Sequence, residues 1–86
     1  MLKYVAVFKY FYSDGIDSRT GNELFIDRDV EEKISAGDDA NAIAQMQVLL
    51  QYMQRNKSLL PKRGHSPPSR VELVKLVQVT ERIVLI

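Results

Sequence analysis

Few side chains in this sequence could act as a catalyst or hold a metal ion. His65 is the only histidine, and it lies in a segment that is rich in proline. A single histidine cannot build a multi-histidine metal site, and the neighbours of His65, Gly64 and Ser66 in a proline-rich loop, give no sign of a histidine-based triad. The chain contains no cysteine, which excludes thiolate metal sites and disulfide bonds and favours a reducing compartment. We therefore interpret His65 as a solvated loop residue and expect a cytoplasmic protein.

The acidic side chains match no calcium-binding or catalytic pattern. One segment contains Asp14, Asp17, Asn22 and Glu23. Their spacing does not fit the D-x-[DN]-x-[DN]-G sequence of a calcium loop, so ordinary turn chemistry explains them better. Neighbouring carboxylates at 31–32 would point to opposite faces of a strand, and those at 38–39 suit the start of a helix. The sequence also lacks a glycine-rich phosphate loop, so we expect no cofactor, no metal ion and no enzymatic activity.

A basic segment carries the other chemical signal. Within a stretch that holds no acid, the sequence places Arg55, Lys57, Lys62, Arg63 and Arg70. Basic side chains attract phosphate backbones, and exposed tyrosines can stack on bases. However, the net charge is only +1, and no RNP-type motif of glycine and aromatic residues occurs. Nucleic-acid binding is therefore the alternative hypothesis, beside that of a solvated loop that offsets the acidic segment.

Charge is distributed unevenly along the chain. Residues 14–39 hold nine acidic and three basic side chains, a local charge of −6. Residues 40–86 hold seven basic and two acidic side chains, a local charge of +5. Either the two regions neutralise each other within the fold, or they form a dipolar surface that steers association with a partner or a second copy.

Hydrophobic patterning predicts the elements that position these side chains. Residues 2–12 are rich in aromatic and β-branched side chains on both faces, which is typical of a central strand. Residues 13–22 collect turn-forming side chains and predict a long hairpin loop. Residues 23–27 and 29–36 then form one bent or bulged second strand, in which apolar and polar side chains alternate in the second part.

The segment from Ala40 to Gln54 has the periodicity of an amphipathic helix but carries no charge. Asp38 can cap its free backbone N–H groups, and we expect the helix to end near Lys57 or Ser58. The stripe that would face the sheet contains Ala42, Ile43, Met46, Leu49, Leu50 and Met53.

The outer side of this helix predicts a contact surface. It carries Asn41, Gln45, Val48 and Tyr52, with Gln51 on its flank. Val48 and Tyr52 lie one turn apart and point away from the predicted core. Neutral amides cost less to desolvate than full charges, so this side suits burial against a partner.

The last strand and the sheet as a whole predict a second contact surface. Residues 59–69 form a loop with three prolines, and residues 70–86 form a strand with a bend near 80–82. The order β-β-α-β predicts one α+β domain over residues 1–86, with a single helix on one face of a mostly antiparallel three-stranded sheet. The other face would expose apolar side chains, and the terminal edge could pair with another sheet through Val84, Leu85 and Ile86.

These features together predict a non-enzymatic protein-interaction domain that self-associates, as a dimer, or that binds another protein. A chain of this size without cofactor chemistry suits a phage or plasmid accessory protein that works by binding another macromolecule. No segment approaches the roughly 20 apolar residues that cross a bilayer, so we expect no membrane association. No small-molecule ligand is indicated. The helix surface and the sheet surface remain alternative sites for the interface.

Overall fold

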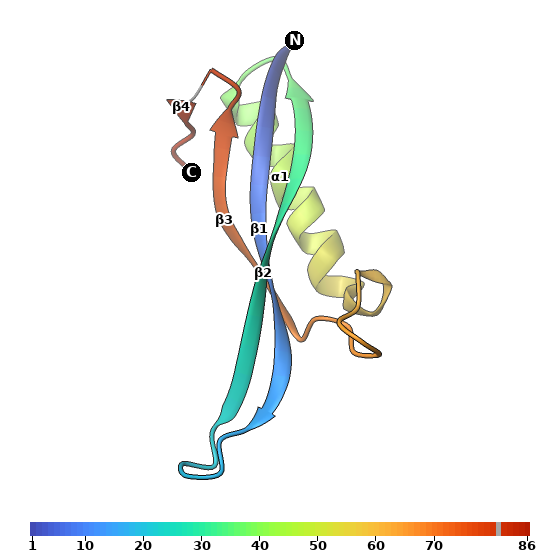
Figure 1. Cartoon of the computed structure of the whole chain (residues 1–86). Helices are drawn as coiled ribbons and strands as arrows, with labels where there is room; N and C mark the ends of the chain where they lie inside the picture. The colour runs from blue at the N-terminus through green and yellow to red at the C-terminus, as the bar shows by residue number, and fades with distance from the viewer. Residues whose placement is uncertain (81) are drawn as a thin grey trace.

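Figure 1 shows a computed structural model of the chain, and the structure describes residues 1–80 and 82–86. Within these residues, one α-helix packs against a sheet of four strands, so the predicted α+β class is confirmed. The elements follow in the order β1 (Leu2–Ile16), β2 (Glu23–Ala36), α1 (Asp39–Arg55), the short 3-10 helix η1 (Lys57–Leu59), β3 (Arg70–Gln78) and β4 (Arg82–Ile83).

The strands lie in the order β2-β1-β3-β4, and each neighbouring pair is antiparallel. The first strand is central and lies between its hairpin partner and β3, as predicted. The prediction of three strands is wrong. The chain reverses after Gln78, and Arg82 and Ile83 pair back onto Gln78 and Val77 as a fourth strand. Glu81, in the middle of the predicted bend, lies outside the described residues.

The β1–β2 hairpin extends beyond the rest of the sheet (Figure 1). β3 pairs with β1 only as far as Phe11, whereas β2 pairs with β1 as far as Ile16. Residues 12–26 therefore form a two-stranded arm with no third strand beside it among the described residues. The predicted loop 13–22 shortens to 17–22, and the irregularity of the hairpin lies in β1, between Ser13 and Ile16, rather than in β2.

Hydrogen bonds close the turn at the tip of the arm. The Asp17 N–H donates to the Asn22 carbonyl and the Gly21 N–H donates to the Asp17 carbonyl, both at 2.8 Å. The Asp17 side chain accepts from the Arg19 N–H at 2.8 Å, which is an Asx turn. Gly21 has a φ of 73°, a left-handed conformation that glycine adopts without steric cost. Asp17 thus serves the turn, whereas Asp14 pairs with Arg63 at 3.0 Å and Glu23 accepts from the Ser13 hydroxyl at 2.7 Å.

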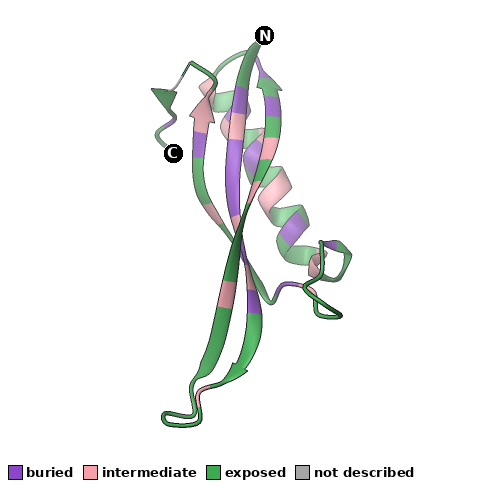
Figure 2. Ribbon diagram, in the orientation of Figure 1, coloured by how far each residue is buried: buried purple, intermediate pink, exposed green. Residues whose placement is uncertain are grey.

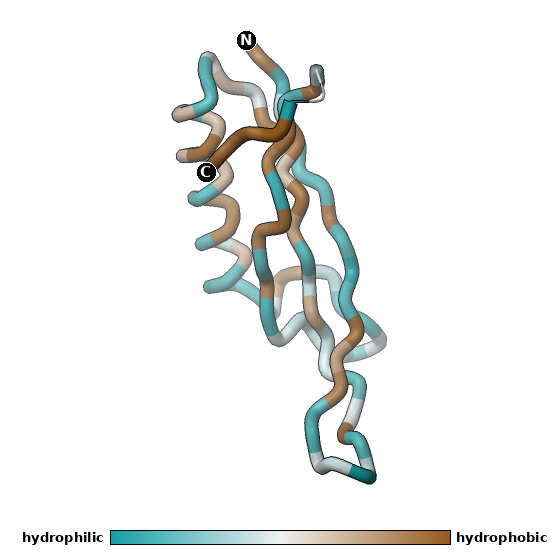
Figure 3. Tube along the Cα trace, turned by 90° about the vertical axis from the view of Figure 1, so that its left-hand side faces the viewer, coloured by the Kyte–Doolittle hydropathy of each residue, from teal (hydrophilic) through white to brown (hydrophobic). Residues whose placement is uncertain are grey.

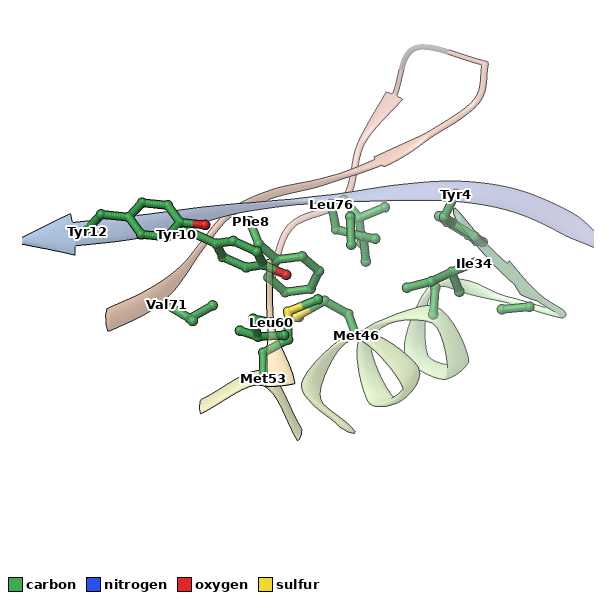
Figure 4. Close-up of a cluster of buried hydrophobic side chains, with 14 residues drawn as sticks. Tyr4, Phe8, Tyr10, Tyr12, Ile34, Met46, Met53, Leu60, Val71 and Leu76 are labelled. Atoms are coloured by element: carbon green, nitrogen blue, oxygen red, sulfur yellow. The ribbon is translucent and has the colours of Figure 1, made fainter. Parts of the chain in front are cut away.

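The core lies between α1 and one face of the sheet (Figure 4). The largest fully buried side chains are Tyr4, Phe8, Met46 and Leu76. The helix buries Ala42, Met46 and Met53 and partly buries Ile43, Leu49 and Leu50, so the predicted stripe is confirmed. Burying a side chain such as Leu76 contributes about 1.5–3 kcal/mol, which is how a small domain offsets the entropy of ordering its chain.

The helix begins where the sequence predicts and ends earlier. The Asp38 carboxylate accepts from the Asn41 N–H at 2.8 Å and caps the first turn. The helix stops at Arg55 rather than near Lys57 or Ser58. Both the backbone N–H and the side-chain amide of Asn56 donate to the Tyr52 carbonyl at 2.9 Å, and a 3-10 turn follows.

Candidate interaction surfaces

The outer side of α1 presents the two apolar side chains that the sequence predicts there. Val48 is 66% exposed and Tyr52 is 53% exposed, and Asn41 and Gln51 are exposed beside them. Gln45 is less available, because its amide donates to the Ser35 carbonyl and to the Asn41 side chain, each at 2.9 Å. The helix surface therefore offers one apolar pair, and two of its predicted polar partners are already bonded within the chain.

The face of the sheet turned away from α1 is a second surface, called the open face here. Strand pairing places Val5 and Val7 of β1 on it, beside Val77 and Lys75 of β3. None of the described elements packs over this face (Figure 2). Side chains of α1 are instead buried against the alternate residues of β1, such as Phe8.

A β-bulge enlarges the apolar part of the open face. Val7 pairs with Lys75 and Phe8 pairs with Leu73, so Val74 is an extra residue in β3. Val74 is 48% exposed. Its neighbours Leu73 and Leu76 both pack toward α1, which leaves Val74 and Lys75 on the other side of the sheet.

Five aliphatic side chains on this face are exposed or partly exposed and are together called the valine patch here: Val5, Val74, Val77, Val79 and Ile83. Val5 and Val77 are partly buried, and the other three are exposed. Val79 is 59% exposed and Ile83 is 60% exposed. Ile83 pairs with Val77, and the Val79 N–H donates to the Lys3 carbonyl at 2.9 Å, which fixes both side chains beside β1 and β3. The patch contains no aromatic side chain and lies at the end of the sheet opposite the arm.

A hollow of about 370 Å³ adjoins the valine patch. It is lined by Lys3, Tyr4, Val5, Lys33, Ile34, Ser35 and Val79. Most of these residues belong to β1 and β2, so the hollow lies over the β1–β2 side of the sheet. Its lining is mainly apolar, and lysines stand at its margin.

Charges on the open face are arranged by strand. The acidic residues Asp27, Asp29 and Glu31 follow one another along β2. Lys9 of β1 stands 3.8 Å from both Asp27 and Asp29. These exposed ion pairs add little stability, but they give the β2 side of the face a negative character and the β1 side a positive one.

The C-terminal residues divide between core and surface. Val84 is only 3% exposed, and its N–H donates to the Leu76 carbonyl at 2.9 Å. Its side chain therefore belongs to the core and is not available to a partner, which corrects its place in the predicted terminal edge. Leu85 is 90% exposed and Ile86 is 63% exposed. The terminal segment is strongly hydrophobic and runs beside the sheet (Figure 3).

A hydrogen-bonded cluster that the sequence analysis missed joins three distant parts of the chain. The Asp39 carboxylate accepts from the Tyr4 hydroxyl at 2.7 Å and from the Arg82 guanidinium at 2.6 Å. Arg82 also donates to the Gln78 side chain at 2.7 Å. The bonds from Arg82 and then Tyr4 lower the pKa of Asp39, while the bond to Asp39 raises the pKa of Tyr4. Every polar group here has a partner, so the cluster ties β4 to the helix start.

Among the basic residues proposed for nucleic acid, Arg70 lies apart on the open face, whereas the other four belong to the end of α1, η1 and the loop that follows. Arg70 stacks on Phe11 at 4.2 Å from the ring centroid, on the open face, and lies 3.3 Å from Glu72. Arg63 lies 3.0 Å from Asp14 of the arm. The other members are Arg55 at the helix end, Lys57 in η1 and Lys62 in the loop.

Most of the tyrosines that could have stacked on bases are buried. Tyr4, Tyr10 and Tyr12 face α1 and are at most 3% exposed, so they cannot stack on bases. The Tyr12 hydroxyl donates to the Pro61 carbonyl at 2.7 Å. Of the four tyrosines in the sequence, all in the described part of the chain, only Tyr52 is exposed. His65 is exposed in the turn after Arg63, in line with the sequence interpretation.

Comparisons with known proteins assign no family to the chain. No family model, no curated protein and no solved structure matches it. Among residues 1–80 and 82–86, no helix combines the length and apolar character needed to span a bilayer. The surfaces of the domain itself are therefore what points to a function.

Proposed function

We propose that this chain is a non-enzymatic protein-interaction domain that self-associates as a homodimer. One observation carries the proposal: a single helix covers one face of the sheet, and the other face exposes the valine patch. Monomeric proteins rarely leave a contiguous apolar patch of this kind in water, because burying it against another surface is favourable.

The size of the domain strengthens this proposal. A chain of 86 residues buries a smaller fraction of its surface than a larger domain does. Its core is a single layer between α1 and the sheet. A second copy packed on the open face would give the sheet a second buried side and add apolar contacts that one chain cannot make by itself.

The free edge of β2 supports association through a face rather than through strand addition. β2 is an outer strand and carries Asp27, Asp29, Glu31 and Glu32. Antiparallel pairing of two β2 strands would bring these like charges together, which disfavours it. Charged side chains on an outer strand are a usual protection against such pairing.

The test is the mass of the wild-type protein in solution. Sedimentation velocity from micromolar to nearly millimolar concentration should show a monomer that converts to a dimer as concentration rises. A species that stays monomeric over the whole range would contradict self-association. Mass growth without a plateau at the dimer would contradict the closed homodimer, because an open assembly has no fixed size.

A further inference from the structure

Two surfaces could form the dimer, and they differ in extent. The helix surface offers Val48 and Tyr52, while its neighbours Asn41 and Gln45 are hydrogen-bonded to each other. The open face offers the five aliphatic side chains of the valine patch, of which Val74, Val79 and Ile83 are exposed. A hollow adjoins each surface, of about 370 Å³ beside the valine patch and about 470 Å³ beside Val48, so the two surfaces are compared by their aliphatic side chains alone. Larger apolar area gives a larger hydrophobic gain, so the open face is the stronger candidate.

Strand pairing fixes how the open face is laid out. Three of the rows that cross the sheet are Lys33, Val5, Val77 and Ile83, then Glu31, Val7 and Lys75, and then Asp27, Phe11 and Arg70. In the second and third of these rows the acidic residue is on β2 and the basic residue is on β3, whereas Lys33 of the first row is a basic residue on β2. The two ends of a row thus carry opposite charge in the second and third rows.

We propose that two copies of this chain pack open face to open face around a two-fold axis that runs parallel to the strands. This inference rests on the self-association proposed above and names its surface. Such an axis places each row of one copy opposite the same row of the other copy and reverses the order of the strands. β4 of the first copy therefore lies over the β1–β2 side of the second, and β4 of the second copy makes the identical contact with the first.

Shape supports this arrangement. Ile83 stands exposed on β4, in the same row as Val5 and Lys33. Both of those residues line the hollow on the β1–β2 side. The reversal of strand order places Ile83 of each copy above the hollow of the other, at the roughly 10 Å separation of packed sheets.

Charge supports it as well. At the level of the second row, Glu31 of one copy faces the half of the other sheet that holds Lys75, and in the third row Asp27 faces the half that holds Arg70. An axis perpendicular to the strands would instead set β2 against β2, with acidic side chains opposite each other. A further row lies between these two and consists of Asp29, Lys9 and Glu72. It has an acidic residue at each end, so at this level Asp29 of one copy faces the half of the other sheet that holds Glu72, and only the Lys9 side chains of the two copies offset these charges.

Cross-linking between two single-cysteine variants tests the arrangement, because the natural chain has no cysteine. Lys33→Cys and Ile83→Cys lie on opposite outer strands, about three strand spacings or ~14 Å apart within one copy. A short bismaleimide that spans about 10 Å should join the two proteins when they are mixed. The Lys33→Cys protein alone and the Ile83→Cys protein alone should each form no more cross-linked dimer than the Ser18→Cys variant. That variant serves as the control, because its cysteine lies at the tip of the arm.

The outcomes distinguish a wrong choice of dimer surface from the absence of self-association. A dimeric wild type whose mixed variants do not cross-link above the Ser18→Cys background would overturn the open-face arrangement and leave self-association standing. Val48→Cys that cross-links efficiently to itself would assign the dimer to the helix and also overturn it. A wild type that is monomeric at all concentrations would contradict the proposed function, and with it the arrangement.

A second measurement uses charge at the centre of the contact. Ile83→Lys should raise the dimer dissociation constant at least about tenfold, because an unpaired ammonium group would be buried. The matched variant Val48→Lys, at a similarly exposed position on α1, should leave the constant within about twofold. Circular dichroism and urea unfolding at monomeric concentrations check that both variants fold. The opposite ranking of the two variants would overturn the proposal.

Discussion

Asp39 receives hydrogen bonds from residues near both ends of the chain. Tyr4 lies 35 residues before it and Arg82 lies 43 residues after it. No motif in the sequence announces such a cluster, because its members meet only when β1, the helix start and β4 are assembled. The sequence predicts a place for Asp39 at the start of the helix, and the structure confirms that it lies in the first turn; its two side-chain partners are seen only in the structure.

This cluster predicts a specific dependence of stability on pH. The pKa of Asp39 is lowered in the folded state from its ordinary value of 3.8. Its bonds therefore stabilise the fold fully above that value, and the contribution is lost as pH falls through the lowered folded pKa. Asp39→Asn should lower the urea midpoint at neutral pH, and its difference from wild type should shrink in acid below pH 3.8.

A variant of the partner residue provides the control for this prediction. Arg82→Gln removes the ion pair between Asp39 and Arg82 by changing the arginine instead of the aspartate. The free-energy losses of the two variants, measured by urea unfolding at neutral pH, should therefore add to more than the loss of the double variant. Strictly additive losses, or a difference from wild type that persists unchanged in acid, would contradict the assigned role.

Val84 and Leu85 are neighbours with opposite environments, which makes them a matched pair. Val84→Ala should lower the free energy of unfolding by about 1–3 kcal/mol, because it removes buried methyl groups from the core. Leu85→Ala should change it by less than about 0.5 kcal/mol, as expected for an exposed position. Urea unfolding of the monomer measures both. Equal effects would contradict the division of the C-terminal segment between core and surface.

At the scale of elements, the prediction succeeded where a local signal was strong. The position of Asp38 before the helix predicts the cap, and the spacing of apolar residues predicts the buried stripe of α1. Both predictions are confirmed. The C-terminal reversal was not predicted as a separate strand. The sequence between Gln78 and Ile83 contains no glycine, proline or asparagine, and so lacks the usual turn signals.

The arm includes residues that the sequence predicts to be a loop. The prediction places a loop at 13–22, but Gly15 lies within β1 at a φ of 92°. The strand continues past it to Ile16, because a bulge accommodates the irregularity between Ser13 and Ile16. A glycine in a strand is compatible with either a turn or a bulge, and pairing with β2 decides between them. The sequence predicts a bend or a bulge in β2, and the bulge of this hairpin lies in the opposite strand, between Ser13 and Ile16.

Hydrogen exchange should distinguish the arm from the body of the sheet. Residues 5–11 of β1 lie between two paired strands, whereas residues 13–16 and 23–25 have one partner strand each. The arm also contributes no side chain beyond Tyr12 to the buried core. We therefore expect arm amides to exchange by local opening, well before those of β1 within the body. Native-state exchange followed by NMR measures this, and equal protection along β1 would contradict it.

For the whole molecule, the sequence predicts the layer arrangement and an apolar uncovered face, but not which side chains make up that face. A central first strand, flanking β2 and β3, and one covered face all follow from composition and connectivity. The valine patch does not, because it depends on a bulge at Val74 and on the return of Ile83 beside Val77. The positions of the charges could not be predicted either. Glu31 and Lys75, or Asp27 and Arg70, lie in one row across the sheet only because of the register in which β2 and β3 pair with β1.

The elongated shape has a practical consequence for anyone who labels this protein. The molecule extends over 50 × 24 × 17 Å, and both ends of the described chain lie away from the arm tip (Figure 1). A fluorophore or purification tag attached beside Leu85 would stand next to the valine patch and could obstruct it. The hydrogen-bonded turn around Ser18 lies at the far end, so a probe placed there reports on the molecule while leaving its contacts free.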